Sequence, residues 1–142
     1  MSKEAQVRTH RDLEVWKQAM DLAIETYRVT ANFPREELYG LAQQARRSAV
    51  SIASNIAEGA ARSSRKEFIQ FLSVSLGSAA ELETQALLAH RLGFLREENI
   101  HHRITQVRKM LAGLICSLKP EGRRHLQSKQ TTAQFSPVTR HL

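Results

Sequence analysis

Residues 97–118, EENIHHRITQVRKMLAGLICSL, contain the most regular heptad pattern of the chain. Apolar residues recur in this stretch at alternating spacings of four and three, namely Ile100, Ile104, Val107, Leu111, Leu114 and Leu118. This is the period of an amphipathic helix that packs against other helices. We therefore expect a helix over about residues 97–118, with this stripe facing a helical core.

Three further stretches have the same period: residues 13–32, 35–60 and 64–93. Short connections between helices of similar length place sequential helices as antiparallel neighbours. The sequence therefore predicts an all-α, up-and-down antiparallel four-helix bundle over residues 12–118. Residues 1–11 are expected to form a flexible N-terminal arm. Residues 119–142 lack periodicity and are expected to form a basic, disordered C-terminal tail.

Turn and cap residues mark the ends of the two middle helices. Pro34 is suited to open the second helix, and Gly59 is suited to end it. Ser64 and Glu67 have the spacing of a capping box, which predicts the start of the third helix. Small residues dominate the stripe of the second helix, so we expect it to be the most enclosed of the four.

The first helix carries more apolar surface than one core stripe requires. The stripe expected to face the core consists of Leu13, Trp16, Met20, Ala23 and Tyr27. Val15, Leu22 and Val29 repeat every seven residues on another face. Burying the first face leaves the second exposed, and self-association would cover it. Val15, Leu22 and Val29 are therefore predicted to form an oligomer interface, the alternative being that they are tolerated surface residues.

The formal net charge of +7 is concentrated in two segments. One is the short stretch 62–66, and the other is the C-terminal tail. Clustered cations suit a polyanion such as RNA, DNA or an acidic protein. The alternative is a solvated turn followed by a disordered tail. The candidate nucleic-acid-binding residues are Arg62, Arg65, Lys66, Arg123, Arg124 and Lys129.

No arrangement of residues typical of catalysis or metal binding is found. Cys116 is the only cysteine, and none of the six histidines belongs to an HExxH or ExxH motif. We therefore expect a protein that is not an enzyme, with no catalytic residues, no metal site and no cofactor. The sequence also lacks a membrane span and a signal peptide, which favours a soluble, cytoplasmic protein with no membrane partner.

A polar stripe runs along the second predicted helix. Arg47, Ser51, Asn55 and Glu58 follow one another at spacings of four, four and three among small apolar residues. Polar groups in such surroundings need partners, and antiparallel pairing with the third helix would bring Glu81 near Arg47. A structural network is the favoured interpretation, and a ligand groove and a catalytic site are the alternatives.

Several ungapped blocks together resemble one known family. The blocks are Arg11-Asp12-Leu13-Glu14-Val15-Trp16, Arg46-Arg47-Ser48-Ala49-Val50-Ser51-Ile52, Asn55-Ile56-Ala57-Glu58-Gly59, Ser64-Arg65-Lys66-Glu67-Phe68, and Gly77-Ser78 with Glu81-Leu82-Glu83. In this order they resemble the bacterial four-helix-bundle proteins encoded in 23S rRNA intervening sequences. The likeness covers about residues 8–118. Ala53 departs from the family motif, which has proline at this position.

The resemblance implies a cytoplasmic bundle that assembles as a ring-like homopentamer, in a family with no established enzymatic activity. It also implies similarity to the accessory variability proteins of diversity-generating retroelements, which are basic pentamers that bind nucleic acid and a reverse transcriptase. The leading hypothesis is therefore a non-enzymatic oligomer that binds the RNA or DNA backbone with low sequence specificity. The alternative is a protein-interaction scaffold that docks a partner polypeptide such as a reverse transcriptase.

Overall fold

The structure, a computed structural model, describes residues 9–120 and is helical almost throughout this range. Four α-helices follow one another along the chain: α1 (Glu14–Thr30), α2 (Leu41–Ala60), α3 (Arg65–Arg91) and α4 (Asn99–Leu118). Short 3-10 turns, η1 (His10–Asp12) and η2 (Arg35–Glu37), precede α1 and α2. Between residues 9 and 120 there is no β-strand. None of the helices in this range is both long enough and apolar enough to cross a membrane.

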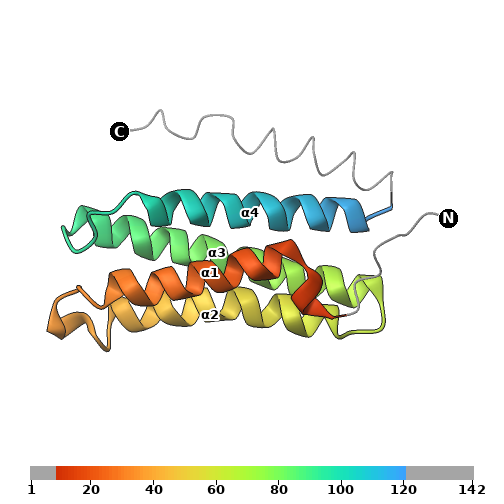
Figure 1. The fold of residues 1–142 in the computed structure, drawn as a ribbon, viewed down its shortest axis with the longest axis horizontal. Helices are drawn as coiled ribbons and strands as arrows, with labels where there is room; N and C mark the ends of the chain where they lie inside the picture. The colour runs from red at the N-terminus through yellow and green to blue at the C-terminus, as the bar shows by residue number, and fades with distance from the viewer. Residues whose placement is uncertain (1–8, 121–142) are drawn as a thin grey trace, which may run out of the picture.

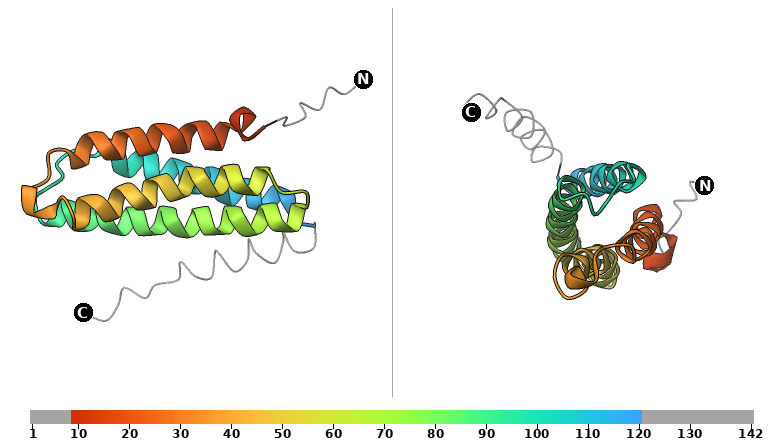
Figure 2. Two further views of the ribbon diagram at one scale, coloured as in Figure 1. Left: turned by 90° about the horizontal axis from the view of Figure 1, so that it is seen from below. Right: turned by 90° about the vertical axis from the view of Figure 1, so that its left-hand side faces the viewer.

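The four helices form an antiparallel bundle (Figure 1). Sequential helices pack side by side, and α4 closes the arrangement by packing against α1 (Figure 2). The diagonal pairs, α1 with α3 and α2 with α4, lie further apart, with no two Cα atoms within 8 Å of each other. The prediction of an up-and-down four-helix bundle is thus confirmed for the described part of the chain.

Helix α4 shows the predicted stripe over most of its length. Ile100, Ile104, Val107 and Leu111 are buried as expected. In the last turns the stripe moves by one residue, so that Ile115 is buried while Leu114 is only half-buried. An α-helix has 3.6 residues per turn, and a heptad pattern therefore drifts around a straight helix.

Helix α1 is rotated relative to the prediction: Leu13, Trp16 and Ala23 of the predicted stripe do lie in or against the core, but the fully buried stripe is a different one. Val15, Leu22 and Val29 are 4%, 0% and 4% exposed, so they are core residues. Met20 and Tyr27, which were expected in the core, are 39% and 49% exposed. The predicted oligomer interface at Val15, Leu22 and Val29 is therefore wrong.

Two threonines explain why the buried face of α1 is hard to recognise. Thr26 and Thr30 interrupt this stripe with polar groups, yet both are buried. The Thr26 hydroxyl donates to the Leu22 carbonyl over 2.7 Å, and the Thr30 hydroxyl donates to the Thr26 carbonyl over 2.6 Å. Because each hydroxyl is satisfied within its own helix, burying these residues leaves no unpaired donor.

Helix α2 begins later than predicted but ends at Ala60, as the range 35–60 predicts, with Gly59 inside its last turn. Pro34 opens the short turn η2, and α2 itself starts only at Leu41. A carboxylate oxygen of Glu37 accepts from the Leu41 backbone N–H over 3.0 Å and so caps the start of α2. Gly59 lies within the last turn of the helix, where a Cβ atom would come within 2.7 Å of the Phe71 Cβ.

Helix α3 begins and ends as the sequence indicates. The Glu67 backbone N–H donates to the Ser64 hydroxyl over 3.1 Å, as in the predicted capping box. At the other end Gly93 adopts a φ of 80°, a left-handed conformation that glycine reaches without steric cost. Inside the bundle the buried Ser75 hydroxyl donates to the Ile52 carbonyl of α2 over 2.8 Å, which ties α3 to its closest neighbour.

We predict that Leu22→Ala destabilises the fold by about 2 to 4 kcal/mol, because it leaves a cavity in the core. The matched change Met20→Ala, on the exposed face of the same helix, is expected to cost less than about 1 kcal/mol. Urea unfolding of both variants measures the difference. A greater destabilisation by Met20→Ala would reverse the assignment of the two faces of α1.

Candidate nucleic-acid interface

The basic stretch 62–66, called the basic turn below, covers the turn that joins α2 to α3 and the first two residues of α3, Arg65 and Lys66. Arg62, Arg65 and Lys66 are all exposed. Arg62 pairs with Glu58 one helical turn earlier, at 2.9 Å, and its guanidinium carbon lies 4.9 Å from the centre of the Phe71 ring. Arg65 and Lys66 form no ion pair with any other described residue. Two cations of this turn therefore have no partner among residues 9–120.

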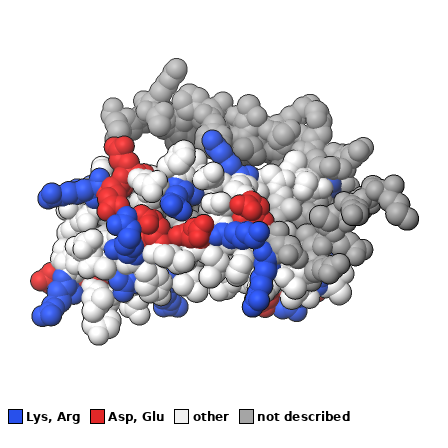
Figure 3. Space-filling view, in the orientation of Figure 1, with Lys and Arg blue, Asp and Glu red and all other residues white. Residues whose placement is uncertain are grey.

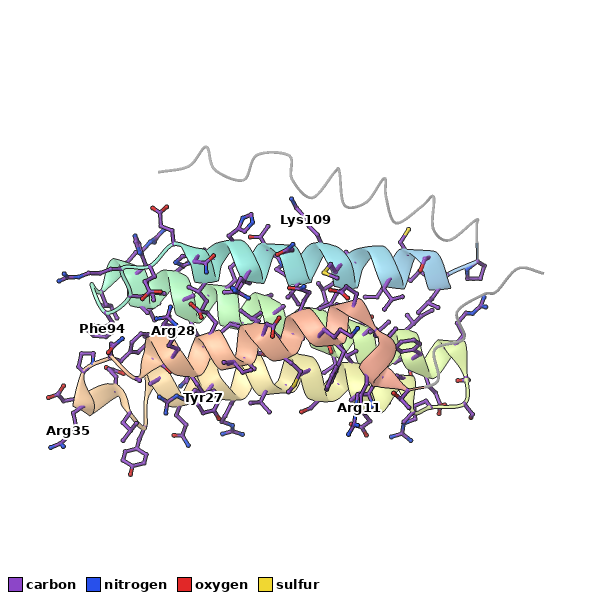
Figure 4. All side chains as sticks on the ribbon, in the orientation of Figure 1. Arg11, Tyr27, Arg28, Arg35, Phe94 and Lys109 are labelled. Atoms are coloured by element: carbon purple, nitrogen blue, oxygen red, sulfur yellow. The ribbon has the colours of Figure 1, made fainter. Side chains whose placement is uncertain are left out.

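Both ends of the described chain lie beside this turn, at the same end of the bundle. Helix α1 begins there and α4 ends there (Figure 1), and Arg11 of η1 lies at the same end (Figure 4). The predicted tail residues Arg123, Arg124 and Lys129 lie outside the described residues. The chain leads into that segment from this same basic end.

The charges on the face formed by α1 and α4 neutralise one another instead. Acidic and basic side chains lie side by side across it (Figure 3). Arg28 on α1 donates to Glu25 at 2.6 Å and also pairs with Glu97. The hydrogen bond from Arg28 lowers the pKa of Glu25, and the two carboxylates raise the pKa of Arg28. The guanidinium of Arg28 is thus already paired with two carboxylates of the described chain.

The predicted polar stripe separates into two groups. Ser51 and Ser78 join α2 to α3 through a hydrogen bond of 2.9 Å between their hydroxyls. The Asn55 amide donates to the Ser51 carbonyl at 2.8 Å and to its hydroxyl at 3.0 Å. Glu58 instead pairs with Arg62 of the basic turn.

Arg47 and Glu81 stay outside this network. Both are exposed, and no hydrogen bond or ion pair joins them within the described chain. The expected proximity of Arg47 to Glu81 therefore does not produce an ion pair. The contacts of Ser51 and Asn55 are those of a structural link between two helices, since their polar atoms are used within the bundle.

The ring beneath Arg62 was missed from the sequence alone. Phe71 packs against Gly59 and lies under the guanidinium of Arg62, where it orients one cation of the turn. The signal lay in Gly59, which was interpreted as a helix end. A glycine inside an antiparallel helix pair is also the residue that admits a ring from the facing helix.

A second polar group lies at the opposite end, where α3 turns into α4. The rings of His90 and His101 meet edge to face with their centres 5.7 Å apart. The His90 Nδ1 lies 3.1 Å from the Leu95 carbonyl, which fits a donated hydrogen bond. Burial lowers the pKa of His101, and His90 lowers it further, while Glu83 and Glu98 act in the opposite direction. Residues 9–120 contain no group of three side chains able to hold a metal ion.

Two shallow depressions lie at this same end of the bundle. One, of about 380 Å³, is bordered by Val29 on α1 and by the segment from Gly93 to Glu97. Figure 4 shows Arg28 beside Phe94 in this region. The other, of about 360 Å³, lies between the end of α1 and the start of α2.

Comparison with known proteins shows the family of the chain. A family model for the 23S rRNA-intervening sequence protein matches residues 11–113. The chain belongs to this family. The resemblance noted in the sequence is therefore confirmed at the level of the 23S rRNA-intervening sequence proteins. No curated protein matches the chain.

A solved structure of similar fold supports this assignment. It is the crystal structure, at 1.70 Å resolution, of a protein of unknown function from the S23 ribosomal protein family of Bacteroides thetaiotaomicron. The two chains are 27% identical and superpose with a TM-score of 0.66. The match covers 71% of this chain and 94% of the other.

We predict that the free energy of unfolding falls as the pH drops below about 6.5, the unperturbed pKa of histidine. The folded pKa of His101 is lowered, so the unfolded chain binds more protons in that range and the stability is complete only above it. His101→Gln should remove this part of the pH dependence. Urea unfolding of both proteins at pH 7.5 and below measures it, and equal pH dependence would contradict the prediction.

Proposed function

We propose that this chain is a non-enzymatic, cytoplasmic homo-oligomer that binds the RNA or DNA backbone with low sequence specificity. The observation that carries the proposal is the α2–α3 turn, where Arg65 and Lys66 are exposed without a partner among the described residues. Phosphate groups are the natural partners of such cations, because each neutralised phosphate releases counterions. Phosphate contacts of this kind carry no sequence information.

The aromatic residues favour backbone contact over base stacking at this turn. Phe71 lies under Arg62, and Trp16 packs against the core and the ring of His10. Neither ring is free to act as a platform for bases. Tyr39, which is 84% exposed, lies in the connection between α1 and α2 at the other end of the bundle.

The proposed assembly is a ring-like homopentamer, as the resemblance to accessory variability proteins implies. Its contact surface is the outward face of α1, where Met20, Ile24 and Tyr27 are 39%, 64% and 49% exposed. Val50, 42% exposed on the neighbouring helix α2, adds to this apolar surface. Covering it in the oligomer would remove apolar side chains from water. Several copies of the basic turn would then bind one polyanion together, which raises the affinity.

We predict that the triple variant Arg62→Gln, Arg65→Gln, Lys66→Gln binds RNA with a weaker salt dependence. The slope of log Kd against log salt should fall by about one for each phosphate that is no longer neutralised. Fluorescence anisotropy with a labelled mixed-sequence RNA at several salt concentrations measures it. The matched variant Arg91→Gln, Arg96→Gln, Lys109→Gln removes the same charge elsewhere and should keep the original slope.

Two outcomes would reject the basic turn as the binding surface. One is an unchanged slope in the first triple variant, and the other is an equal fall in both. Binding that is insensitive to salt from the outset would favour the alternative, a scaffold that docks a partner polypeptide.

We predict a light-scattering mass of about five protomers for the unmodified protein. Ile24→Glu places a charge in the proposed contact and should reduce this mass, while the helical circular dichroism stays unchanged. Tyr39→Glu, an equally drastic change at an exposed site outside the contact, should leave the mass as it is. A monomeric parent protein would reject the assembly, and an unaffected Ile24→Glu variant would reject this surface.

A further inference from the structure

One arginine outside the basic turn is held in a fixed orientation. Arg46 of α2 is half-buried, and its Nε donates to the hydroxyl of Thr30 on α1 over 2.8 Å. Its guanidinium carbon lies 4.9 Å from the centre of the Tyr27 ring. Thr30 is itself only 3% exposed, and its hydroxyl is fixed by the Thr26 carbonyl. A buried hydroxyl and a ring face thus define where this guanidinium lies.

The fork of this guanidinium has no partner within residues 9–120. Its single described hydrogen bond uses Nε, so the two terminal nitrogens remain for a ligand. A guanidinium offers parallel N–H groups that match the two oxygens of a carboxylate. Because Arg46 is already oriented, a ligand would lose less side-chain entropy on binding it than on binding a mobile arginine.

Arg46 stands at the edge of the depression of about 360 Å³ between α1 and α2. The depression is also lined by the apolar residues Phe33, Pro34, Leu38 and Ala42 and by a second cation, Arg35. Arg35 projects from the loop end of the bundle (Figure 4). Among the described residues, no acidic side chain lines the depression. The carboxylate of nearby Glu37 is engaged by the Leu41 backbone N–H.

We propose that this depression receives an acidic, apolar peptide segment of a partner protein. A carboxylate of that segment binds the fork of Arg46, and the apolar side chain beside it packs on Phe33 and Leu38. Charge complementarity supports this occupant, since two arginines and no carboxylate of residues 9–120 face the depression. The proposal is independent of nucleic-acid binding, which is assigned to the opposite end of the bundle.

An apolar lining favours a peptide over a nucleic acid at this position. Phosphates are flanked by sugars and water, so they gain little from Phe33, Pro34 and Leu38. An aspartate or glutamate next to a leucine or phenylalanine uses both the cation and the apolar surface. The chemistry of the depression therefore differs from that of the α2–α3 turn, where Ser63 and Ser64 separate the cations along the chain.

The probe is the peptide acetyl-Leu-Asp-Phe-Leu-amide, titrated into the full-length protein and followed by NMR at the Arg46 Nε–H signal. We expect saturable shifts of this signal and of the backbone signals around Leu38. The same peptide with asparagine in place of aspartate should bind at least about tenfold more weakly, because a neutral amide cannot form the charge-assisted pair. Absence of saturable shifts, or equal binding of the two peptides, would overturn the proposal.

Variants test whether Arg46 is the binding group. Arg46→Gln should weaken binding of the peptide by about tenfold or more, and Arg46→Lys should also weaken it, since lysine lacks the fork. Leu38→Ser changes only an exposed side chain and should weaken binding without touching the Arg46 contacts with α1. Arg47→Gln, at the adjacent exposed arginine, is the matched control and should bind as the parent does.

Two further results would overturn the proposal that Arg46 binds an acidic peptide. If Arg47→Gln weakens binding of the peptide as much as Arg46→Gln does, the interaction is a general effect of charge and the proposal fails. If a short single-stranded oligonucleotide shifts the Arg46 signal at lower concentration than the peptide, this surface binds nucleic acid and the peptide assignment is overturned. Backbone spectra of each variant show whether the bundle is intact.

Discussion

The close contact of α2 with α3 is the constraint on which the rest of the bundle depends. Gly59 leaves room for the Phe71 Cβ and the Phe68 ring of α3, and the buried hydroxyl of Ser75 reaches the carbonyl of Ile52. Small side chains let the two helix backbones approach, and the hydrogen bond fixes their register. Helices α1 and α4 then pack on the two sides of this pair and on one another. The turn between the paired helices is consequently held in place at one end of the bundle.

The sequence predicts the fold well where periodicity and capping agree. The stripe of α4 and the Ser64 cap are examples, because each depends on local chemistry alone. The orientation of α1 could not be read correctly, since two apolar faces competed and the true one contains Thr26 and Thr30. Hydroxyls that bond to their own helix are invisible to a count of apolar residues. The late start of α2 coincides with a cap from Glu37, a local contact four residues before Leu41 that the usual Ser, Thr, Asp or Asn cap pattern does not indicate.

The sequence predicts that cationic residues cluster at the candidate interface, but it does not predict how their side chains are arranged or paired. The sequence places Arg62, Arg65 and Lys66 in one turn, yet only the structure shows that Glu58 occupies Arg62 and leaves the other two available. The same limit applies to Arg46. Its orientation by Thr30 and Tyr27 requires α1 and α2 to be aligned, and a sequence pattern contains no such information.

An even number of antiparallel helices has a practical consequence for anyone handling this protein. The described chain begins at residue 9 and ends at residue 120, both beside the basic turn, so a bulky or acidic label introduced near either position would shield the turn. A label placed at the opposite end avoids this. The exposed connection around Tyr39 is suited to that purpose when nucleic acid is under study, and positions near residues 9 and 120 are suited to it when the depression near Arg46 is under study.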